Sequence, residues 1–99
     1  MKASKVDIAR AVLNEREYQD TKWGTIEDRP HTVGEWLLIA EQELHEAKLE
    51  WCRGKGDHGA LEELLQVIAV GFACLEQHGI VEDPRRLLAT KLMTSEPIR

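Results

Sequence analysis

An apolar stripe with helical spacing between residues 33 and 51 is the feature that most constrains the fold. Its members recur at intervals of three and four residues over about five turns, namely Val33, Trp36, Leu37, Ala40, Leu44, Ala47 and Trp51. No segment alternates apolar and polar residues with the period of two that marks a half-buried strand. The sequence therefore predicts an all-α fold, with this stripe, including Trp36 and Trp51, facing the core.

Capping signals divide the chain into further helices. Ser4 with Asp7 resembles a capping box that opens a first helix, which we expect to run to about Lys22 with Ile8, Ala9, Val12 and Leu13 on its apolar face. Residues 24–32, GTIEDRPHT, have the composition of a loop. Thr32 and Glu35 form a T-x-x-E box at the start of the second helix, which ends at RGKG.

A third helix is predicted from Asp57, as N-cap, to the residue before Gly79, and Asp83-Pro84 begins a short last helix. The third helix is apolar on two sides. Its main stripe comprises Leu61, Leu64, Leu65, Ile68, Phe72 and Leu75, and a second side carries Val67, Val70, Gly71 and Cys74. So small a chain cannot cover both sides. We expect one domain over residues 1–99, an antiparallel bundle of about four helices completed by a homodimer or homotetramer.

Composition narrows the classes of partner. The 99 residues include 18 acidic and 13 basic side chains, a formal net charge of -5, which argues against a nucleic acid polymer or an anionic membrane as partner. No N-terminal signal segment is evident, and no apolar run is expected to span a bilayer. We expect a cytoplasmic protein in which Cys52 and Cys74 are reduced thiols.

Acidic residues border the apolar stripes of the two central helices. Glu43, Glu46 and Glu50 share one flank of the second helix, and Glu63 with Gln66 lies on the second apolar side of the third. One interpretation is a solvated acidic face. In the other interpretation, antiparallel packing brings the acidic residues of the two helices together. A hard cation, Mg²⁺ or Mn²⁺, then neutralises them and holds a phosphate-bearing ligand. The sequence lacks Glu-x-x-His units and zinc-ligand spacing.

The segments EQELHE and EELLQV resemble the motifs of MazG-type all-α nucleoside triphosphate pyrophosphohydrolases, EExxE followed by ExxD. EREYQDTKWG and ELLQVIAV also resemble segments of small MazG-like proteins, so the resemblance covers roughly residues 10–78. It implies magnesium-dependent release of nucleoside monophosphate and pyrophosphate, with metal ligands at Glu43, Glu46, Glu63 and Gln66. Gln42 and Gln66 depart from the motifs, because these positions carry a glutamate and an aspartate in the family.

The catalytic residues expected on this basis are Glu43, Glu46 and Glu50, with Glu50 as proton acceptor. Trp23 is expected to stack on a nucleobase while Lys22 or Arg16 contacts phosphate. Alternatively, Trp23 closes one end of the bundle beside an exposed lysine. The alternative function is a noncatalytic helical oligomerisation or nucleotide-binding module with a degenerate metal site.

Overall fold

Three long helices form the described part of the chain. The computed structural model describes residues 2–86, in which α1 spans Lys5–Trp23, α2 spans Val33–Arg53 and α3 spans Asp57–His78. Residues 84–86 form one further helical turn, so the predicted fourth helix begins as expected and the rest of it lies outside the described residues. The all-α prediction is confirmed, since residues 2–86 contain no strand.

Two of the three predicted starts of the long helices are confirmed by side-chain caps. The Ser4 hydroxyl accepts a hydrogen bond from the Asp7 amide at the start of α1. At the start of α2, Thr32 and Glu35 form the reciprocal capping box, each side chain accepting from the other's backbone N–H. The prediction for Asp57 is wrong: Gly56 is the N-cap of α3, and Asp57 accepts instead from the indole Nε1 of Trp51.

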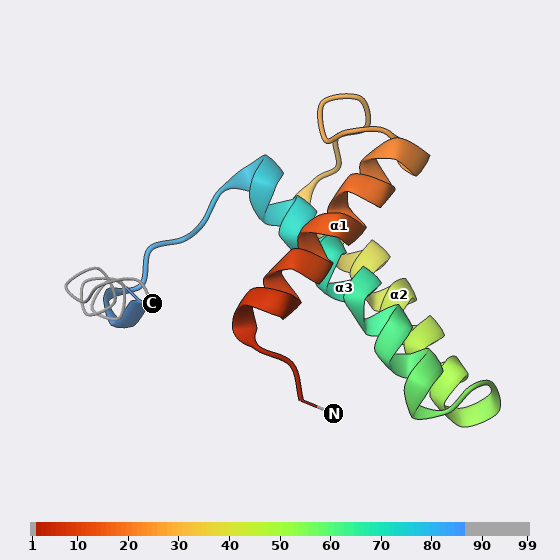
Figure 1. Ribbon diagram of the computed structural model, residues 1–99. Coiled ribbons are helices and arrows are strands. Elements are labelled where there is room, and N and C mark those ends of the chain that lie inside the picture. The colour runs from red at the N-terminus through yellow and green to blue at the C-terminus, as the bar shows by residue number, and fades with distance from the viewer. Residues whose placement is uncertain (1, 87–99) are drawn as a thin grey trace.

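The helix α3 is the centre of the arrangement. It returns antiparallel beside α2 after the tight turn 54–56, whereas α1 lies across α3 and packs against it (Figure 1). Among the described residues α1 makes no comparable contact with α2. The polypeptide is therefore a helical hairpin crossed on one side by a third helix, so the antiparallel prediction describes α2 and α3 but not α1.

The core inside one chain consists of small side chains. Its buried apolar residues are Val12, Ala47, Ala69, Val70 and Ala73. Small residues allow helix backbones to approach closely, and α1 contributes Val12 to this core. Val70, predicted to lie on a surface shared with a partner, is therefore buried within its own chain.

The larger apolar side chains remain exposed, which corrects the predicted core. The exposed members of the stripes on α2 and α3 are Val33, Leu37, Leu44, Trp51, Leu61, Leu64, Ile68, Phe72 and Leu75, and on α1 Ile8 and Leu13 are also exposed. A groove between α2 and α3, lined by residues including Leu44, Trp51, Leu61 and Leu64, joins the two stripes into one surface. We call the exposed α2 and α3 stripe residues the apolar face. The prediction failed because one crossing helix cannot cover both sides of the hairpin.

One helix also has the length and composition of a membrane span. The 22 residues of α3 include an 18-residue window of mean hydropathy 1.4, which corrects the expectation that no apolar run was long enough. The central helix of a soluble protein can have the same properties. Glu62 and Glu63 lie in its first two turns, and α1 and α2 pack against it.

Candidate metal centre and adjoining cavity

Three carboxylates from α2 and α3 converge at one point of the hairpin. Glu43 and Glu46 lie on consecutive turns of α2, and Glu63 lies on α3. Each contributes one carboxylate oxygen to a group whose members all lie within 4.8 Å of one another. Antiparallel pairing of the helices produces this meeting, because it sets the second turn of α3 against the second half of α2. We call these three residues the carboxylate cluster.

The cluster is electrostatically unfavourable as it stands. Glu43 Oε2 and Glu63 Oε2 are buried and have no hydrogen-bond partner among residues 2–86. Burial raises the pKa of Glu43, and repulsion from Glu46 and Glu63 raises that pKa further. Burial likewise raises the pKa of Glu63, and repulsion from Glu46 and Glu50 raises that pKa further. A divalent cation would offset both the lost hydration and the mutual repulsion of these groups.

A fourth carboxylate, absent from the sequence-based set, faces the cluster from α1. The half-buried Glu15 adds to the repulsion that raises the pKa of both Glu43 and Glu63. It lies three residues after the buried Val12 and next to the buried Arg16. The sequence could have indicated that Glu15 lies near the packed side of α1, because Val12 is on the predicted apolar face. It could not indicate that Glu15 reaches the cluster, because this depends on how α1 crosses α3.

A cavity of about 590 Å³ adjoins the cluster, between the second half of α1, the loop 24–32 and α2. One side of α2 forms a wall of it, with Trp36, Ile39, Glu43 and Glu46 on successive turns. The volume lies within the range of small-molecule sites. Trp36 was expected in the core, and its position on this wall is a correction.

The three predicted substrate-binding residues all line this cavity. Trp23, at the end of α1, is 57% exposed, and the Lys22 ammonium lies 4.8 Å from the centre of its ring. The same ammonium lies 5.8 Å from the centre of the Tyr18 ring. No carboxylate pairs with Lys22 within residues 2–86. Lys22 is therefore an available cation, although its contact with phosphate and the stacking role of Trp23 remain predictions.

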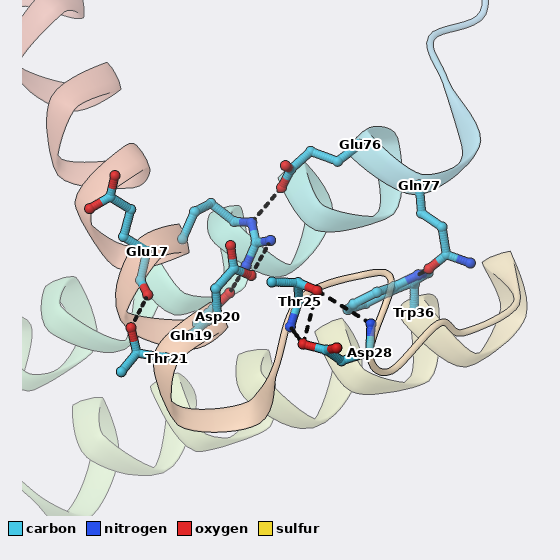
Figure 2. A network of polar contacts seen from close by, with 10 residues as sticks. Glu17, Gln19, Asp20, Thr21, Thr25, Asp28, Trp36, Glu76 and Gln77 are labelled. Carbon is cyan, nitrogen blue, oxygen red and sulfur yellow. Dashed lines mark hydrogen bonds and ion pairs between the residues drawn. The ribbon is translucent and has the colours of Figure 1, made fainter.

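Arg16 already has three hydrogen-bond partners within the protein. Its buried guanidinium donates to Glu76 at 2.7 Å, to Asp20 at 2.8 Å and to Gln19 at 3.1 Å. The contact with Glu76 ties α1 to the last turn of α3, and the acceptors are drawn in Figure 2. Phosphate binding by Arg16 stays a prediction, since its three nitrogens already have acceptors.

The two remaining predicted residues, Glu50 and Gln66, lie in different surroundings from each other. The Glu50 carboxylate lies at the turn between α2 and α3, where its Oε2 accepts from the Lys55 amide at 3.4 Å. A Cβ on Gly59 would lie 2.7 Å from that oxygen, so a glycine allows Glu50 to sit there. Its role as proton acceptor stays a prediction. Gln66 lines the cavity, as a ligand to a shared cation would require.

The departures from the MazG motifs can be placed in this geometry. Gln42 is exposed and does not line the cavity, so the missing negative charge there lies outside the cluster. Gln66 does line it, so the amide at the position where the resemblance implies a charged ligand lies at the cavity. Comparisons of the chain with models of protein families, with curated proteins and with solved structures find no match.

Proposed function

We propose that this chain is a MazG-like, magnesium-dependent nucleoside triphosphate pyrophosphohydrolase that acts as a homo-oligomer. The observation that carries the proposal is the carboxylate cluster, two of whose buried oxygens have no hydrogen-bond partner within residues 2–86. The cluster adjoins a cavity that is also lined by basic and aromatic side chains. A solvated acidic face would leave these oxygens in contact with water, whereas buried carboxylates are stabilised either by a bound proton or by a cation.

The donor set favours a hard cation. The three groups of the cluster are carboxylates, and no histidine or cysteine joins them in the described part of the chain. Oxygen-only ligation suits Mg²⁺ or Mn²⁺ rather than zinc. Glu43, Glu46 and Glu63 would hold the ion, with the Gln66 carbonyl as a neutral ligand.

The remainder of the cavity suits a nucleotide. Lys22 supplies a cation that pairs with no carboxylate in the described part of the chain, and Trp23 and Trp36 supply flat rings. Such a set complements a ligand that is polyanionic at one end and aromatic at the other. In a protein of net charge -5, a bound cation would also be needed to admit a triphosphate.

The reaction that fits these groups is attack of water on the phosphate chain, which releases nucleoside monophosphate and pyrophosphate. A bound divalent ion supplies charge screening and lowers the pKa of water. The protein contributes the cluster that holds the ion and a further carboxylate to accept the proton. Glu15, which faces the cluster, joins Glu50 as a candidate for that second role.

The apolar face supports the homo-oligomeric part of the proposal. Its members include Leu37, Trp51 and Leu61, which are 64%, 60% and 64% exposed. Soluble chains rarely leave a continuous surface of this kind uncovered, and a second copy offers a self-complementary one. Four members of the face, Leu44, Trp51, Leu61 and Leu64, line the α2–α3 groove.

Magnesium binding tests the proposal directly. Isothermal titration of the metal-free protein with MgCl₂ is expected to show saturable binding that Glu43→Gln weakens strongly. Glu41→Gln is the matched control, because Glu41 is an exposed glutamate on the same helix and outside the cluster. Equal affinities in all three proteins, or no binding in the wild type, would contradict the metal site.

The second candidate is a nucleotide-binding module that does not hydrolyse its ligand. The neutral Gln66 favours this alternative, because it reduces the negative charge available to the cation. Magnesium-dependent nucleotide binding without pyrophosphate release would select it.

A further inference from the structure

The last turn of α3 fixes two segments that are distant in sequence. The Gln77 amide oxygen accepts from the His31 backbone N–H at 3.1 Å and from Trp36 Nε1 at 2.9 Å. Its Nε2 donates to the His31 carbonyl at 2.7 Å. Figure 2 shows Gln77 reaching down from α3 to the Trp36 ring. One side chain thus holds the end of the loop and the first turn of α2 together.

These contacts fix an aromatic wall of the cavity. The edge of the His31 ring meets the Trp36 ring, with ring centres 4.7 Å apart and planes at 85°. Both residues line the cavity. Trp36 precedes Glu43 by two turns on the same side of α2, a rise of about 10 Å at 1.5 Å per residue. The wall is therefore separated from the carboxylate cluster along the direction in which an extended ligand would lie.

We propose that the base of the nucleotide stacks on Trp36, and that Gln77 is the positioning residue that holds this ring in place. The inference rests on the proposed function, which supplies the nucleotide, and it adds the residue that receives the base. Gln77 itself does not touch the ligand. It acts through the orientation of Trp36 and of the His31 backbone.

Trp36 is better suited to this role than Trp23. The Trp23 ring is 57% exposed and already has the Lys22 ammonium over it. Trp36 has its N–H satisfied and its plane fixed by groups from α3 and the loop. A ring that is already ordered loses less conformational freedom when a ligand binds.

The test separates the base from the phosphates by using two ligands. A nucleoside triphosphate and inorganic tripolyphosphate, each with Mg²⁺, are titrated into wild type, Trp36→Leu and Gln77→Leu. Trp51→Leu is the matched control, since Trp51 is on the same helix and also donates its indole N–H, to Asp57 at 2.9 Å, but does not line the cavity. Circular dichroism verifies that each variant is folded, and sedimentation verifies that Trp51→Leu, which alters the apolar face, keeps the oligomeric state of the wild type.

The expected result is a loss of affinity for the nucleoside triphosphate alone. Trp36→Leu should weaken nucleoside triphosphate binding by about 5-fold to 150-fold, the range for loss of base stacking, and leave tripolyphosphate affinity unchanged. Gln77→Leu should lower affinity for the same ligand alone. Trp51→Leu should bind both ligands like the wild type.

Several outcomes would overturn the inference. Unchanged nucleotide affinity in folded Trp36→Leu does so, and so does an equal loss for both ligands or an equal loss in Trp51→Leu. If Gln77→Leu does not fold, Gln77→Glu replaces it, because a carboxylate keeps the acceptor for His31 and Trp36 and removes the donor to the His31 carbonyl. Unchanged nucleotide affinity in that variant overturns the positioning role. Wild type that binds neither ligand would instead refute the proposed function.

Discussion

Replacement of Leu61 by serine should weaken self-association while leaving the fold of each chain intact. Leu61 is 64% exposed and lines the groove that joins the two halves of the apolar face. Full burial of a leucine side chain contributes about 1.5–3 kcal/mol, so covering its exposed part contributes about 1–2 kcal/mol per chain. A symmetric dimer contains the contact twice, and the loss becomes about 2–4 kcal/mol, or roughly 30-fold to 1000-fold in the dissociation constant.

Leu38→Ser provides the matched control for this experiment. Leu38 is 66% exposed, lies on α2 and belongs neither to the stripe nor to the groove. Both variants exchange the same residues without a change in net charge. Sedimentation equilibrium over a range of protein concentrations should show the Leu61 variant dissociating far above the concentration at which wild type and the Leu38 variant dissociate. A monomeric wild type at micromolar concentration, or identical dissociation constants for all three, would refute the role of the apolar face.

Three further predictions concern stability and pH. Arg16→Met should lower the free energy of unfolding by about 1–3 kcal/mol in urea denaturation, because Glu76 and Asp20 lose their buried partner but remain partly solvated. An unchanged urea midpoint would show that the ion pairs of Arg16 do not stabilise the packing of α1 on α3. Thr32→Ala should cost about 0.5–2 kcal/mol through loss of the capping box, and an unchanged melting temperature would exclude that contribution. The raised pKa of Glu43 means that the folded, metal-free protein binds this proton more tightly than the unfolded chain does, so stability falls as pH rises above the ordinary value of 4.5. Glu43→Gln should therefore become more stable relative to wild type between pH 4 and pH 7 in EDTA, and a constant difference would count against the strained cluster.

Local signals in the sequence sufficed for the helices and for part of the candidate site. The cap at Thr32 needs only residues three positions apart, and the meeting of Glu43 and Glu46 with Glu63 follows once two helices pair antiparallel. Glu15 could not be placed in this way, because its approach to the cluster depends on where α1 crosses α3. The same holds for Gln77, whose partners His31 and Trp36 lie more than 40 positions earlier in the chain.

The side of each helix that is buried was also beyond local reasoning. Periodicity identified the stripe on α3 that includes Ile68 and Phe72, but a stripe is equally apolar whether its own chain or another covers it. The side of α3 that is buried within the chain carries the small or medium-sized Ala69, Val70 and Ala73. The larger apolar residues of α3, such as Ile68 and Phe72, remain exposed and are available to pack against another molecule.

Release of pyrophosphate from nucleoside triphosphates is the measurement that tests the central claim most directly. With millimolar Mg²⁺, the wild type should release pyrophosphate and nucleoside monophosphate in equal amounts from at least one nucleoside triphosphate, and EDTA should abolish the reaction. Glu43→Gln should lower the rate by about 10-fold or more, while Glu41→Gln should retain it. Absence of pyrophosphate release from every common ribo- and deoxyribonucleoside triphosphate, or equal rates in wild type and Glu43→Gln, would contradict the assignment of the carboxylate cluster as a catalytic metal centre.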